Sequence, residues 1–229
     1  RGCRASPSTW NQARIMNITM WLLRKLPILC ALSGAASAAV PVGSVVMYSD
    51  GRVEKLMSHR DGELLWEDDR KRQFVRSENP IMPVLRRTDF LSGKGHSQSV
   101  GEGNPDSIRQ LPSGTRVGFT VVRARYSGER SIRNWDCKHL GKRQEKVLGV
   151  MRELDSFACE RFVIQRKTWQ KNFRESRQFS YSRDLGLVVE MQRKTRKKSS
   201  GWKLVSIVPP DKASYKRLSK KVRKLRAAR

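Results

Sequence analysis

Short apolar runs separated by turn-forming residues dominate the pattern along residues 43–76, "GSVVMYSDGRVEKLMSHRDGELLWEDDRKRQFVRS". Asp-Gly pairs at 50–51 and 61–62 are strong hairpin signals, and Asp68-Asp69 marks a third turn. The pattern therefore predicts an N-terminal β-meander over residues 39–85. Its expected strands lie near 43–48, 52–58, 63–67 and 72–76.

A second β-region is predicted over residues 114–208. The stretch "TRVGFTVVRARY" alternates with period two, which places Val117, Phe119 and Val121 on one face of a strand. The segment "EKVLGVMRELDSF" is ambiguous, because both a helix and two short strands joined by a turn fit its spacing. Further strands are expected near 131–138, 158–166, 176–182, 187–192 and 202–208.

Between these regions, residues 86–113 are rich in Gly, Ser, Asp and Asn, which is typical of a flexible loop or linker. The Gly-Lys-Gly of this segment lacks both the Ser or Thr after the lysine and the earlier glycine of a phosphate-binding loop. We therefore expect a mainly β protein, built as an antiparallel meander, a curved sheet or a partial barrel.

A basic amphipathic tail is predicted over residues 209–229, after Pro209 and Pro210. Apolar residues recur at spacings of three and four, which gives a helix a narrow apolar stripe among Lys and Arg. The stripe consists of Tyr215, Leu218, Val222 and Leu225. Such a helix can lie on an anionic membrane surface or contact phosphates. A frayed, solvated tail is the alternative.

The segment "MNITMWLLRKLPILCALSGAASAAVPVG" has the three parts of a secretory signal. Arg24 and Lys25 supply its positive charge, an apolar run follows, and Ala36-Ser37-Ala38 provides small residues for cleavage after Ala38. An uncleaved N-terminal anchor is the alternative. We expect the mature protein to be periplasmic or secreted. Residues 1–15 precede Met16 and are left out of the fold argument.

Export changes the interpretation of the cysteines. Cys3 lies in the leader and Cys30 in the predicted signal, so cleavage would leave Cys137 and Cys159. In an oxidising compartment an even number of cysteines favours a disulfide, worth about 3 kcal/mol in the chain-entropy model. Two unpaired structural cysteines, or a nucleophilic pair of Cys137 with His139, are the alternatives.

The net charge is +27, and the first 38 residues carry five of these charges, so the mature chain would carry +22. Such an excess favours polyanionic partners. A solvated basic surface with a high isoelectric point and no such partner is the alternative. For an exported protein we expect an anionic envelope component, such as lipid head groups or polysaccharide, with peripheral membrane contact through the tail. Nucleic acid is the expected partner only if the chain is not exported. Our candidate anion-binding residues are Arg193, Lys194, Arg196, Lys197, Lys198, Lys216, Arg217, Lys220, Lys221, Arg223, Lys224 and Arg226.

No constellation of residues indicates catalysis. The acidic clusters at 67–69 and 153–155 could face each other in a glycosidase-like cleft, but adjacent Asp residues at hairpin tips are usually turn formers. Zinc is a poor fit, since no Cys-x-x-Cys pair occurs and the three histidines are scattered. We expect a non-catalytic domain without metal or cofactor.

The order of these features resembles exported bacterial β-sheet proteins of unknown function. The resemblance rests on an opening with Gly43 and Tyr48-Ser49-Asp50-Gly51, then Trp66-Glu67-Asp68-Asp69, Trp135-Asp136-Cys137, and the hairpin "YSRDLGLVV" at 181–189. It spans roughly residues 41–208 and departs at 147–154, where that group has a Pro-Ala-Gly turn and Phe. It implies location and fold but no chemistry, and it places both cysteines in a framework of paired strands.

Overall fold

The computed structural model describes residues 39–82, 84–165 and 168–227, which belong to one compact unit, Ala36–Arg229. The leader and the predicted signal peptide, through Ala38, lie outside the described residues. No helix within the described ranges is long and apolar enough to cross a membrane.

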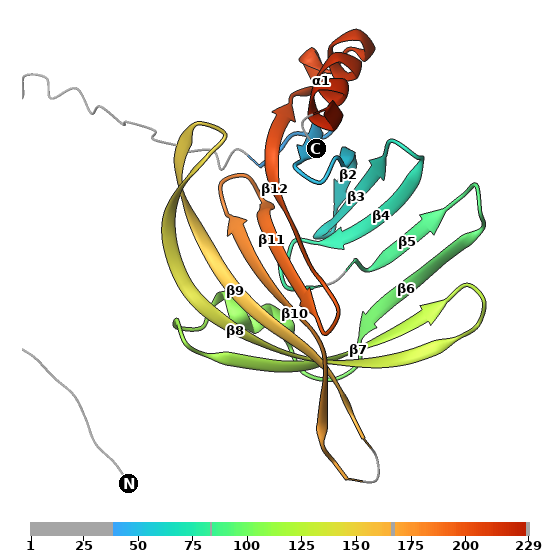
Figure 1. Ribbon diagram of the computed structural model, residues 1–229, viewed down its shortest axis with the longest axis vertical. Coiled ribbons are helices and arrows are strands. Elements are labelled where there is room, and N and C mark those ends of the chain that lie inside the picture. The colour runs from blue at the N-terminus through green and yellow to red at the C-terminus, as the bar shows by residue number, and fades with distance from the viewer. Residues whose placement is uncertain (1–38, 83, 166–167, 228–229) are drawn as a thin grey trace, which may run out of the picture. The chain divides into compact units, whose positions relative to one another are not determined.

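Twelve antiparallel strands in the described part of the chain form a closed barrel, and Figure 1 shows β2 to β12 around its wall. β1 pairs with both β2 and β12 and so closes the barrel. This architecture confirms the predicted mainly β class. The strands are β1 (Val45–Tyr48), β2 (Val53–Arg60), β3 (Glu63–Asp68), β4 (Arg72–Ser77), β5 (Arg86–Asp89), β6 (Lys94–Val100), β7 (Arg116–Arg125), β8 (Arg130–Val147), β9 (Val150–Ile164), β10 (Lys171–Ser182), β11 (Leu187–Thr195) and β12 (Ser199–Val208). Short 3-10 turns at Pro105–Arg109 and Pro210–Lys212 and the helix α1 (Tyr215–Ala227) complete the fold.

The predicted N-terminal meander corresponds to β1–β4, with turns at the predicted positions. Asp61 and Gly62, between β2 and β3, both have positive φ angles (52° and 71°), as a tight two-residue hairpin turn requires. Gly51, between β1 and β2, has a φ of 81°. The local turn signals therefore set the lengths of these strands.

The expectation of a flexible loop at 86–113 is wrong for its first half. Residues 86–89 and 94–100 form β5 and β6, which pair with each other and with β4 and β7. The two buried side chains of β6 are His96 and Gln98, not apolar residues. Because inward polar side chains leave no apolar alternation, the period-two signal was missing here.

The ambiguous segment between the cysteines is a hairpin. Leu148 and Gly149 form the turn between β8 and β9 with positive φ angles (51° and 87°). Cys137 lies directly opposite Cys159 in this pair of strands, and the two are joined in a disulfide. The predicted disulfide is thus present, buried across the longest hairpin.

Apolar side chains pack on both sides of the barrel wall. Inside, one cluster centres on Trp66 and Leu154 and a second on Phe119 and Phe157. Outside, Val45, Met47, Val53 and Val208 form a third cluster beneath α1. The helix covers these residues with Leu218, Val222 and Leu225.

Candidate binding site inside the barrel

Two adjoining cavities occupy the barrel interior, with volumes of about 200 Å³ and 210 Å³. They share lining residues from β3, β10 and β11, among them Leu64, Trp66, Tyr181 and Leu187. Together they reach the lower part of the range for small-molecule sites, roughly 300–1,000 Å³.

Aromatic rings and arginines share the wall of the second cavity. Tyr48 packs edge-on against Trp202, with ring centroids 4.7 Å apart, and the Arg52 guanidinium lies 4.6 Å from each centroid. Phe179 and Met191 extend the apolar side of the wall. The cavity can therefore hold an apolar group beside a positive charge.

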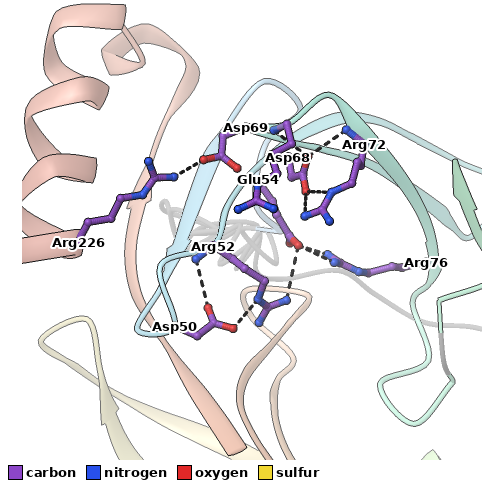
Figure 2. Close-up of polar contacts among 9 residues, drawn as sticks. Asp50, Arg52, Glu54, Asp68, Asp69, Arg72, Arg76 and Arg226 are labelled. Atoms are coloured by element: carbon purple, nitrogen blue, oxygen red, sulfur yellow. Dashed lines mark hydrogen bonds and ion pairs between the residues drawn. The ribbon is translucent and has the colours of Figure 1, made fainter. Parts of the chain in front are cut away.

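Glu54 fixes two of these arginines. Figure 2 shows Arg52 and Arg76 directed at Glu54, which is 2% exposed. Arg76 donates both terminal nitrogens to the Glu54 carboxylate at 2.8 Å, and Arg52 Nη1 lies 3.6 Å from it. Burial opposes the charge on Glu54, but Arg76 and Arg52 outweigh it and hold the pKa of the carboxyl below its ordinary value.

A second buried carboxylate, Glu175 on β10, gathers three more arginines. Arg177 donates to its Oε1 at 2.6 Å, Arg193 Nε donates to its Oε2 at 2.7 Å, and Arg161 Nε lies 3.3 Å away. Burial again opposes the charge, and the arginines, Arg177 foremost, outweigh it and lower the pKa of Glu175. Arg177 also lines the second cavity, so Glu175 and its arginines adjoin the wall of that cavity through Arg177.

Two further arginines, Arg123 and Arg133, face inward and form no ion pair with a carboxylate of the described residues. Arg123 Nη2 lies 3.0 Å from His96 Nδ1, and within the described residues neither Arg123 nor Arg133 has a carboxylate at ion-pair distance. Burial and the neighbouring Arg123 and Arg161 lower the pKa of Arg133 to about 10, so it stays charged at neutral pH. Burial, Arg123 and Arg133 also lower the pKa of His96 to about 4.

The first cavity has a more polar wall. His59 Nε2 lies 2.6 Å from Glu78 Oε1, and the Arg109 guanidinium lies 5.6 Å from the Tyr181 ring centroid. Arg183, also in this wall, pairs with the buried Asp155. Charged side chains therefore line both cavities beside their apolar residues.

The predicted anion-binding residues fall into three groups. Arg193 faces inward and pairs with Glu175, so it does not belong to a basic surface. Lys194, Arg196, Lys197 and Lys198 are exposed on β11 and the turn that follows it. The third group is on α1, where the exposed cations are Lys216, Arg217, Lys220, Lys221, Arg223, Lys224 and Arg226.

The structure alters the interpretation of the tail. The apolar stripe of α1 packs on the barrel wall, except Tyr215, which is 88% exposed. Arg226 pairs with Asp69 in the turn between β3 and β4 (Figure 2). Lys221 Nζ donates to Ser206 at 3.1 Å. This apolar face is therefore not available to a membrane while the helix is docked, and only the basic face is.

The disulfide removes one alternative chemistry, since a bonded Cys137 has no thiol to form a nucleophilic pair with His139. His139 instead stacks on Phe157, with ring centroids 5.1 Å apart, and its Nδ1 lies 3.1 Å from the Leu111 carbonyl oxygen. Asp68 accepts from the backbone N–H groups of Arg70 and Arg72, as a turn former does. Among the described residues no group of His, Cys, Asp or Glu side chains is placed to hold a metal.

Sequence reasoning missed the inward arginines, because a period-two pattern assigns charged positions to the solvent face. A signal was nevertheless present in β7, where Arg123 continues the parity of Val117, Phe119 and Val121. An arginine on the apolar parity of a strand points to a charged site inside the sheet.

The sequence matches no protein-family model, and no curated protein is significantly similar to it. Two solved structures have a similar arrangement. The hypothetical lipoprotein YmcC from Escherichia coli (K12) aligns with a TM-score of 0.48 and 10% identity, over 76% of this chain and 89% of that chain. A protein from Bacteroides fragilis NCTC 9343 with a YmcC-like fold, which is inferred to be exported, aligns with a TM-score of 0.39 and 10% identity, over 74% and 97%.

Proposed function

We propose that this chain is an exported, non-catalytic β-domain of the cell envelope that binds an anionic or apolar envelope component inside its barrel. The observation that carries the proposal is the cavity whose wall combines Trp66, Trp202 and Tyr181 with Arg52, Arg76 and Arg177. Aromatic walls with a few convergent polar groups are typical of small-molecule sites.

Export is supported by the signal-like segment that ends near Ala38 and by the disulfide between the two cysteines that cleavage would leave. We expect mass spectrometry of the protein from a periplasmic fraction to give an N-terminus at Ala39. A cytosolic protein with an intact leader would instead favour a nucleic-acid partner for its positive charge.

Binding is tested with 1-octanol and octyl phosphate as probes. Both are expected to change the tryptophan fluorescence of the purified protein in a saturable way, because Trp66 and Trp202 line the cavity. Leu64→Trp fills the space that both cavities share and is expected to weaken binding at least tenfold. Leu140→Trp, at an exposed position, is the matched control.

Thermal unfolding of both variants shows whether each has folded. Equal affinity of Leu64→Trp and the wild type for both probes, or the absence of saturable binding, would contradict the proposal.

A further inference from the structure

Five arginines on five successive strands converge inside the barrel. The register explains this arrangement, because residues directly opposite each other in paired strands share a face. Arg161 lies opposite both the inward Trp135 and Glu175, Arg133 lies opposite the inward Val121, and Arg177 lies opposite Arg193. We call this set the arginine cluster; its members are Arg123, Arg133, Arg161, Arg177 and Arg193.

The cluster carries more positive charge than its carboxylate neutralises. Within the described residues, Glu175 is the acid that forms ion pairs with cluster members, and it contacts Arg161, Arg177 and Arg193. Five guanidinium groups around one carboxylate leave a local excess of four positive charges. Like charges at such positions destabilise the fold unless an anion compensates them.

Several buried donors in the cluster and beside it are also unused. The Nε atoms of Arg123 and Arg177 and the indole Nε1 of Trp135 are buried without a hydrogen-bond partner in the described part of the chain. The Arg177 guanidinium lies 4.8 Å from the Trp135 ring centroid, so two of these donors are close together. Buried donors without an acceptor are costly and mark a place for one.

We propose that the arginine cluster binds a phosphoryl group, the anionic head of an amphiphile whose apolar part occupies the adjoining cavity. Planar guanidinium groups pair with tetrahedral phosphoryl oxygens through two parallel hydrogen bonds. A phosphate monoester carries about −1.5 to −2 charges at pH 7, which offsets the excess better than one carboxylate. Arg177 lines the cavity and belongs to the cluster, so head and apolar part would meet there. The inference rests on the proposed function and specifies the chemistry of its ligand.

Three probes separate the head from the apolar part, namely inorganic phosphate, octyl phosphate and 1-octanol, each titrated by calorimetry at constant ionic strength. We expect one site per chain and an affinity for octyl phosphate at least tenfold higher than for either other probe. Equal affinities for octyl phosphate and 1-octanol, without saturable binding of phosphate, would overturn the inference while the proposed function stands. Saturable phosphate binding with no effect of Leu64→Trp on octyl phosphate would support the head-group site, but it would overturn the placement of the apolar part in the cavity and, with it, the cavity as the site of the proposed function.

Arg133→Gln tests the role of the arginine cluster in binding. Arg133 forms no ion pair with a carboxylate of the described residues, so its replacement leaves no carboxylate without a partner. Arg174→Gln is the matched control, because Arg174 is exposed on β10 and its substitution removes the same positive charge. We expect Arg133→Gln to weaken octyl phosphate binding about tenfold or more and Arg174→Gln to leave it within twofold.

The melting temperature without ligand distinguishes binding from structure. A cluster built for an anion predicts that Arg133→Gln melts at or above the wild-type temperature, because one repulsive charge is removed, while phosphate stabilises it less. A variant that melts lower and keeps wild-type affinity would show that Arg133 is structural and would overturn the inference. In either case, arginine Nε–H resonances in NMR report contact directly, and those of Arg123 and Arg177 are expected to shift with octyl phosphate.

Discussion

Glu54 illustrates how one buried carboxylate orders the barrel interior. It is 2% exposed and accepts two hydrogen bonds from Arg76, with Arg52 nearby. Removing one partner of a buried ion pair leaves the other charge uncompensated, which is more costly than losing a surface pair.

We therefore expect Glu54→Gln to lower the free energy of unfolding by about 3 kcal/mol. Glu67→Gln, which breaks the surface pair with the exposed Lys71, is the control and is expected to cost less than about 1 kcal/mol. Urea denaturation of both variants measures the difference. Similar losses in the two variants would show that Glu54 contributes no more than a surface charge.

His96 gives the stability a specific pH dependence. Its pKa is about 4 in the folded protein against an ordinary value of 6.5, so between these values the unfolded chain binds a proton that the folded chain does not. Stability is expected to fall as the pH drops from 6.5 to 4. His96→Gln, which keeps an acceptor for Arg123, is expected to flatten the melting-temperature profile in this window.

The loss expected from Glu54 occurs at lower pH, because its folded pKa lies below 4.5. The two contributions are therefore separable in an acid titration. An unchanged slope between pH 6.5 and 4 in His96→Gln would contradict the role of His96.

At the scale of elements, α1 packs against the outer face of the barrel wall. Val222 contacts the outer cluster formed by Val45, Met47, Val53 and Val208. We expect Val222→Asp to destabilise the protein by about 2–3 kcal/mol, since a carboxylate would replace a packed apolar group. Tyr215→Asp, at an exposed position of the same helix, is expected to change stability by less than about 0.5 kcal/mol.

A melting temperature of Val222→Asp equal to that of Tyr215→Asp would show that α1 does not dock in solution. Docking also bears on truncation experiments, because removal of the helix uncovers the outer cluster. A truncated protein would therefore lose stability as well as basic residues.

The sequence predicted those elements whose signals are local. Two Asp-Gly turns and the Asp68-Asp69 turn defined β1–β4, and apolar alternation defined β7. β5 and β6 were missed because the buried positions of β6 hold His96 and Gln98. The interior arginines were missed for a related reason, since the register of paired strands is needed to show which charged side chains share a face.

At the scale of the whole molecule, the strands differ in how firmly they are held. β8 and β9 are long, paired with each other and carry the disulfide, whereas β5 has four residues and pairs with short β4 and β6 segments. We expect backbone amides of β5 to exchange with deuterium well before those around Cys137 and Cys159. Mass spectrometry of exchange tests this order, and equal protection of the two regions would contradict it.

The pairing of β1 with β12 has a consequence for how the chain reaches its native state. Val45 is opposite Val208, so the wall closes only after a segment near the end of the chain has met one near its start. A pairing of such high contact order forms slowly, because the entropy of closing a long loop must be overcome first. During synthesis or translocation, one edge of β1 would therefore stay unpaired until β12 emerges. Products truncated before β12 would keep that edge unpaired, and it could then associate with other chains.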